Sequence, residues 1–100
     1  MYASVRRYEG VVPGSVDEVM RLVGKEGGFA SILARAPGFI AYYAVDAGNG
    51  VVASISVFEN QTGAEESNKM AADWVRENLA AHLPNPPQIT AGEARVHTAA

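Results

Sequence analysis

The side chains with the most chemical potential in this chain fall in a segment that is expected to be helical, residues 62 to about 83. His82 could act as a base, and Trp74 could stack on a flat ligand. Asn68 falls within the apolar arc of this helix, where an amide needs a hydrogen-bond partner. Together these residue types are suited to binding a small aromatic molecule and moving one of its protons.

Hydroxyl groups on a neighbouring strand could complete such a site. Ser54 and Ser56 alternate along the segment 51–58, which ends at Phe58, and Tyr43 lies on the preceding segment. Alternate residues of a strand share one face, so both serines are expected to point the same way. We therefore consider Tyr43 and His82 as candidates for proton transfer, and the following as candidates for substrate binding: Ser54, Ser56, Phe58, Asn68 and Trp74.

Each of these residues also has a purely structural interpretation. A histidine in the last turn of a helix commonly interacts with free carbonyl groups and with the helix dipole. A single tryptophan on the flank of an apolar arc is more often part of a core or an interface. Asn68 could bond Ser54 or Ser56 as readily as a ligand. The alternatives stay open at this point.

Composition excludes several other kinds of site. There is no cysteine, and the two histidines, His82 and His97, lack the spacing of a metal motif, so neither a metal nor another cofactor is expected. The glycines of residues 24–28 do not follow a strand, which argues against a nucleotide-binding loop. A net charge of −3 with one adjacent basic pair argues against nucleic acid. No signal peptide or membrane span is visible, so a cytoplasmic location is expected.

A β-hairpin over residues 37–60 is the element that must position these groups. Asn49-Gly50 tolerates the positive φ angles of a two-residue hairpin loop, and the flanks are rich in β-branched and aromatic residues. Around it the sequence predicts a strand over 2–10, a helix over 15–36 interrupted near 24–28, a helix over 62–83 and a strand over 88–97. Ser15 with Glu18, and Thr62 with Glu65, are the predicted helix caps.

This order, β-α-β-β-α-β, predicts an α+β, ferredoxin-like fold with a four-stranded antiparallel sheet and two helices on one face. Right-handed connections place the first and third strands in the centre of the sheet. We expect a single domain over residues 1–97 and a loose tail over 98–100. The charged residues of the first and last strands are expected at an edge or rim of the sheet. They are Arg6 on the first strand and Glu93 and Arg95 on the last.

The hairpin is apolar on both faces, which predicts a homodimer. The two-residue loop fixes the register, so one face combines Tyr43 and Val45 with Ser54 and Ser56. The other face is more aliphatic; its members are Ile40, Tyr42, Ala44, Asp46, Val51, Ala53, Ile55 and Val57. Helices can cover only one of these faces, and a second copy of the chain is the economical cover for the other. We expect the hydroxyl-bearing face to meet the helices.

In its segments 37–42 (PGFIAY) and 54–59 (SISVFE), and in the acidic helix start that follows, the chain resembles the antibiotic biosynthesis monooxygenase-like family. The resemblance implies a dimeric α+β barrel, in which the sheets of two protomers meet. Enzymes of this kind include cofactor-independent monooxygenases of aromatic polyketides and haem-degrading oxygenases. Their pockets lie between the second helix and the sheet, where this chain has Asn68, Trp74 and His82. The first strand carries Ser4 and Arg6, where the haem-degrading members use an asparagine.

Three functions are consistent with these observations. The first is a cofactor-independent monooxygenase acting on a small aromatic substrate. The second is a non-catalytic dimer that binds or senses a small molecule. The third is a structural dimer whose polar groups satisfy one another. An open cavity beside the polar residues of the second helix would favour the first two.

Overall fold

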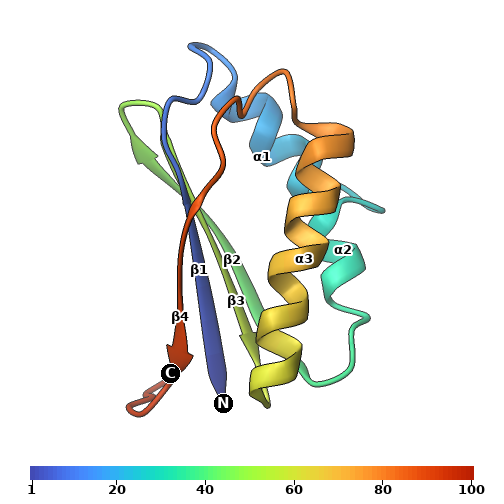
Figure 1. Cartoon of the computed structure of the whole chain (residues 1–100), viewed down its shortest axis with the longest axis vertical. Coiled ribbons are helices and arrows are strands. Elements are labelled where there is room, and N and C mark those ends of the chain that lie inside the picture. The colour runs from blue at the N-terminus through green and yellow to red at the C-terminus, as the bar shows by residue number, and fades with distance from the viewer.

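The computed structural model describes residues 1–100 and contains one antiparallel sheet, in the order β2-β3-β1-β4. Three helical segments cover one face of this sheet and leave the other face bare (Figure 1). The strands are β1 (Tyr2–Tyr8), β2 (Phe39–Gly48), β3 (Val51–Phe58) and β4 (Gln88–Glu93). The predicted ferredoxin-like α+β fold, with the first and third strands in the centre, is confirmed. No helix is long and apolar enough to cross a bilayer.

The first helical region is divided in two, α1 (Val16–Gly24) and α2 (Phe29–Leu33), as the glycines predicted. Gly28 is buried where the chain turns back against the end of α1, and its N–H donates to the Lys25 carbonyl at 2.9 Å. A Cβ at Gly28 would lie 2.3 Å from the Leu22 carbonyl oxygen. Only glycine allows this close approach, so the break between the two helices depends on it.

We expect Gly28→Ala to lower the free energy of unfolding by about 2 to 3 kcal/mol, because backbone atoms would have to move. Gly24→Ala is the matched control: nothing lies within 4 Å of its added Cβ, and alanine favours helix, so a gain of up to about 1 kcal/mol is expected. Urea denaturation of the two variants measures both values. Equal effects would mean that the contact at Gly28 does not matter.

The third helix, α3 (Gln61–Asn78), begins and ends earlier than predicted. Its N-cap is Asn60, whose side chain accepts from the Gly63 N–H at 2.9 Å, and not Thr62. At the other end Leu79 leaves the helical conformation, and a turn carries the chain to Leu83. The predicted cap of the first helix is also incomplete, because the Ser15 side chain makes no capping bond. The last strand ends at Glu93 rather than 97.

The hairpin turn is as predicted, but the register beyond it is not. Asn49 and Gly50 have φ angles of 54° and 74°, which a type I′ turn requires. The register then shifts twice, between Asp46 and Gly48 and between Phe39 and Ala41. Each irregularity moves the following residues to the other face. The predicted grouping of Tyr43 with the serines is therefore wrong.

Tyr42 is the tyrosine that shares the helix-covered face with the serines: it pairs with Ser56, and Ala44 pairs with Ser54. Val52, Ser56 and Phe58 on β3 are buried, which confirms that the hydroxyl-bearing face of this strand meets the helices. Tyr43 instead pairs with Ile55 on the bare face and is 57% exposed. A register shift of one residue thus places Tyr42, and not Tyr43, on the helix-covered face.

The bare face, which we call the outer face, is mostly apolar. Its central row is Tyr43, Ile55, Val5 and Thr90, side by side across the four strands. Flanking rows add Ala3, Ala41, Val45, Ala53 and Val57, with Arg7 and Gln88 at one end. No helix of the chain lies over this face (Figure 1). An uncovered sheet face of this composition is typical of a surface that another chain covers.

Candidate functional site

Arg6 is the centre of the polar network between the sheet and α3, and it is fully buried, with 0% exposed. Its Nη1 donates to Asn68 Oδ1 at 2.8 Å and to Ser67 Oγ at 3.3 Å. Its Nη2 donates to Ser54 Oγ at 2.8 Å and to Ser56 Oγ. The predicted position of Arg6 at an edge or rim is wrong, because β1 is central and Arg6 points toward the helices.

No carboxylate neutralises this buried charge. The ion pairs of the chain join other residues, Arg7 with Glu9, Arg21 with Glu18 and Arg76 with Asp73. Arg6 Nε is buried without any hydrogen-bond partner. Burial disfavours the charged form and so lowers the pKa of Arg6, and the nearby Tyr42 and Tyr8 only partly oppose this effect. A buried cation in this state costs stability, and an anionic ligand nearby would compensate it.

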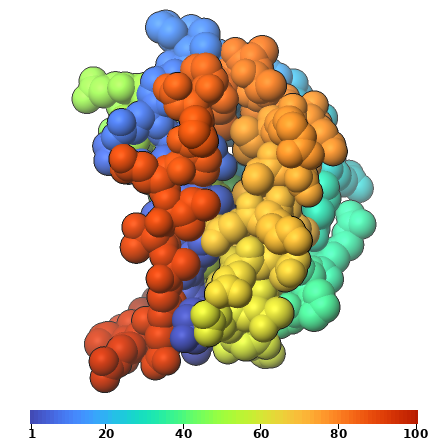
Figure 2. All heavy atoms as spheres, viewed as in Figure 1, coloured from blue at the N-terminus to red at the C-terminus, as the bar shows by residue number.

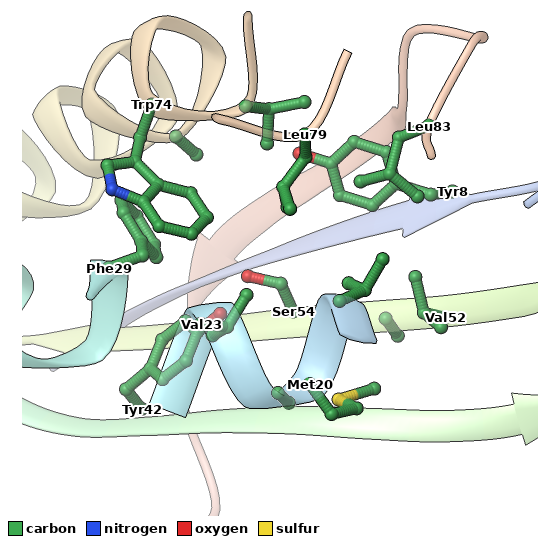
Figure 3. A pocket seen from close by; sticks show the side chains of 15 residues that line it. Tyr8, Met20, Val23, Phe29, Tyr42, Val52, Ser54, Trp74, Leu79 and Leu83 are labelled. Atoms are coloured by element: carbon green, nitrogen blue, oxygen red, sulfur yellow. The ribbon is translucent and has the colours of Figure 1, made fainter. Parts of the chain in front are cut away.

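An apolar cleft adjoins the Arg6 network, between the sheet and the three helices (Figure 3). Phe29, Tyr42 and Trp74 form an aromatic wall; the Phe29 ring centroid lies 5.5 Å from that of Tyr42 and 5.7 Å from that of Trp74. Ser54 contributes a hydroxyl group to the lining. The remaining lining is aliphatic or aromatic: Tyr8, Val19, Met20, Val23, Ala44, Val52, Ala53, Ala71, Val75, Leu79 and Leu83.

Two residues connect the cleft to the buried charge. Ser54 lines the cleft and accepts a hydrogen bond from Arg6, and the Arg6 Cζ lies 6.0 Å from the centroid of the Phe29 ring. The guanidinium is therefore one hydrogen bond behind the cleft wall. Cation and aromatic ring at this distance attract each other, which helps to hold Arg6 in place.

Two tyrosine hydroxyls border the same region. Burial raises the pKa of Tyr42, while hydrogen bonding with Ser54 and the charge of Arg6 act in the opposite direction. Burial also raises the pKa of Tyr8, again opposed by Arg6. Both phenols are therefore neutral donors at physiological pH. They can hydrogen-bond an oxygen atom of a ligand without adding negative charge.

The structure brings some of the predicted site residues together and separates others. Ser54 and Trp74 line the cleft, whereas Ser56 and Asn68 bind Arg6 and do not line it. Asn68 Oδ1 also accepts from Ser4 Oγ at 2.6 Å. The amide thus bonds neither Ser54 nor Ser56, but accepts from Ser4 and from the arginine to which both serines are bonded.

His82, Tyr43 and Phe58 lie away from the cleft. His82 Nδ1 is 2.9 Å from Ser15 Oγ, which joins the turn after α3 to the start of α1. Tyr43 projects from the outer face, and Phe58 is a core residue beneath the start of α3. Arg6, Tyr42 and Phe29 were not predicted from the sequence as neighbours of the site. The signal for Arg6 was the surplus of small polar residues on one inward surface, Ser4, Ser54, Ser56, Ser67 and Asn68.

The cleft is small in the state described. Its cavity volume is about 30 Å³, enough for water-sized molecules, whereas pockets that hold drug-sized ligands usually measure several hundred Å³. An aromatic ligand therefore requires side chains to move. Met20 has a flexible side chain and Trp74 is only partly buried, so these two lining residues are the ones that can move.

Comparisons with known proteins place this architecture among solved structures. No protein-family model and no curated protein matches the sequence. A Nitrosomonas europaea protein of unknown function is 24% identical, with a TM-score of 0.75 over 99% of this chain and 93% of its own. A Streptomyces coelicolor monooxygenase, solved in complex with nanaomycin D, is 18% identical, with a TM-score of 0.73 over 99% and 91%. A further structure, an antibiotic biosynthesis monooxygenase, is 16% identical, with a TM-score of 0.69 over 94% and 98%.

The chain has their fold. At these identities the likeness extends to the arrangement of strands and helices, and it agrees with the resemblance seen in the sequence. The likeness itself does not assign an activity or a substrate to this chain. Those must come from the cleft and the residues around it.

Proposed function

We propose that the protein is a cofactor-independent monooxygenase that oxidises a small aromatic substrate in the cleft between α3 and the sheet. The observation that carries the proposal is the aromatic wall of Phe29, Tyr42 and Trp74 facing Ser54, which is backed by a buried cation. The reaction expected on an anthrone-like phenol converts a ring CH₂ to a carbonyl group. One oxygen atom of O₂ enters the product, and the other leaves as water with the two hydrogens.

Each lining residue has a defined role in this proposal. Trp74 and Phe29 hold the flat substrate by stacking, and the hydroxyls of Tyr42 and Ser54 bind its ring oxygen. His82 and Tyr43 were predicted for proton transfer, and these roles stay predictions, since neither side chain lines the cleft.

Oxygen uptake tests the proposal. With an anthrone-like phenol, we expect the wild-type protein to consume O₂, and Tyr42→Phe and Trp74→Phe to lower kcat/KM by about tenfold or more. Glu77→Gln, an exposed change on the far side of α3, is the control and should match the wild type. His82→Ala and Tyr43→Phe measure the two predicted proton-transfer roles directly. The absence of oxygen uptake across a panel of phenols would contradict the proposal.

A non-catalytic small-molecule binding protein is the second candidate. One observation favours it: no histidine or carboxylate, the usual general bases, lines the cleft. Binding of aromatic probes without oxygen uptake would select this function.

We further propose that the protein acts as a homodimer whose protomers meet through their outer faces. The apolar rows around Ile55 support this assembly, because a sheet face of this size and composition is costly to leave in water. The cleft lies on the opposite side of the sheet, so dimerisation leaves it accessible.

A further inference from the structure

Arg6 carries a charge that the fold itself leaves unneutralised, and this charge lies directly behind the cleft wall. Its four side-chain partners are hydroxyls and an amide, all neutral. Neutral residues of similar size at position 6 would avoid the cost of burying a cation. The arrangement therefore has a cost in stability that packing alone does not explain.

We propose that Arg6 makes the cleft selective for aromatic oxyanions, so that a phenol or enol is bound in its ionised form with its oxygen at Ser54. This inference rests on the proposed function in that it assigns the ligand class of the same cleft. Its test measures binding and not oxygen uptake, however, so the oxyanion inference and the monooxygenase proposal can fail separately.

Ser54 is the group that transmits the charge. Its Oγ accepts from Arg6 Nη2 at 2.8 Å, so its own hydrogen, which can bond the Tyr42 hydroxyl, can turn to donate to an oxygen atom of a ligand in the cleft. A hydroxyl that accepts from a cation is a stronger donor, and hydrogen bonds to an anion are the strong ones. The lining around Ser54 is apolar, which raises the strength of both interactions.

No other charged group in the cleft competes with the ligand for interaction with Arg6. The titratable groups that face the cleft are Tyr8 from β1 and Tyr42 from β2, both with pKa values raised by burial and therefore neutral. The surfaces of α1, α2 and α3 that line the cleft carry no charged side chain. A bound oxyanion would be the one negative charge beside Arg6.

Ionisation on binding has a defined balance: the phenol loses its O–H proton to solvent, and the phenolate stays in the cleft. The pKa of the bound phenol should therefore fall below its value in water. A cation within one or two hydrogen bonds of a group shifts its pKa by about 1 to 2 units.

The test uses 4-nitrophenol, whose phenolate absorbs visible light, titrated with and without an excess of the full-length protein. Wild type is expected to lower the apparent pKa of the bound probe by about 1 to 2 units, and Arg6→Met to abolish this shift. Arg6→Lys, which keeps the charge, should restore part of it. Arg7→Met is the matched control: it removes the neighbouring cation, which is exposed and points to the other face, and it should behave as wild type.

The neutral probe 4-nitroanisole distinguishes loss of the Arg6 charge from loss of the cleft itself. Equal binding of this probe by wild type and Arg6→Met shows that the cleft survives the substitution, and circular dichroism confirms that the variant is folded. A pKa shift that persists in Arg6→Met, or a shift absent from wild type, overturns the inference. Failure of both probes to bind wild type overturns it as well.

An aromatic oxyanion can also be a carboxylate, and binding of 4-nitrobenzoate distinguishes a carboxylate ligand from a phenolate. Arg6-dependent binding of both anions supports the inference, and the ratio of the two affinities identifies the preferred head group. If the phenolate shift is present but oxygen uptake is absent, the inference stands and the monooxygenase proposal fails.

Discussion

The Ile55→Asp variant is expected to be a monomer at micromolar concentration, under conditions in which we expect the wild-type protein to be a dimer. Ile55 occupies the middle of the outer face, between Val5 on β1 and Tyr43 on β2. A carboxylate there remains hydrated in a free protomer, but dimerisation would strip water from it at a cost of several kcal/mol. Two-fold symmetry applies this cost twice, so the dissociation constant should rise by at least about a hundredfold.

Light scattering coupled to size exclusion measures this outcome over a range of concentrations. Lys69→Asp, an exposed substitution on α3, is the control that introduces the same residue away from the outer face. It should leave the dimer intact. A wild-type protein that is monomeric at micromolar concentration would contradict the assignment of the outer face.

The largest loss of folding stability is expected for Phe58→Ala, at about 3 to 5 kcal/mol. Phe58 is 1% exposed, and its ring packs edge-on against Phe39 with 5.8 Å between the centroids. The first turn of α3 crosses this ring so closely that a Cβ at Gly63 would lie 2.6 Å from its Cδ2. Removal of the ring leaves a cavity beneath the helix and lowers the melting temperature by more than about 10 °C.

A double-mutant cycle with Gly63→Ala sharpens this prediction. Alone, Gly63→Ala should cost about 1 to 3 kcal/mol, because its methyl group meets the Phe58 ring. In the Phe58→Ala background the methyl group enters the cavity instead, and the helix propensity of alanine should make the change neutral or stabilising. Additive effects of the two substitutions would show that the contact between ring and helix is not what holds α3 in place.

The order of elements could be predicted from the sequence because local signals determine it. Asn49-Gly50 requires a tight turn, the glycines near 24–28 interrupt the first helix, and the prolines after 83 stop the last helical region. Face assignment depends on counting residues from the turn, and each bulge reverses the count. The irregularities beside Ile40 and Ala47 have no sequence signal of comparable strength. Tyr42 and Tyr43 were therefore each predicted on the wrong face of the sheet.

The site was predicted only in part for a similar reason. Ser54 and Trp74 were found because their positions follow from the alternation of β3 and from the flank of the apolar arc of α3. Arg6 was assigned to a rim because charged residues are rarely buried without a carboxylate partner. The central place of β1 was predicted, but the inward direction of Arg6 is stabilised by hydroxyls from two other elements, β3 and α3. These contacts between distant parts of the chain belong to the tertiary structure and have no local signal in the sequence.

A crystal of the protein soaked with 4-nitrophenol tests the central claim most directly. We expect ligand density in the cleft, with the ring against Trp74 and Phe29 and the phenolate oxygen within hydrogen-bond distance of Ser54 Oγ. Met20 or Trp74 is expected to move to admit it. A cleft that stays closed at saturating probe, or a ring whose oxygen points away from Ser54 and Arg6, would contradict the account.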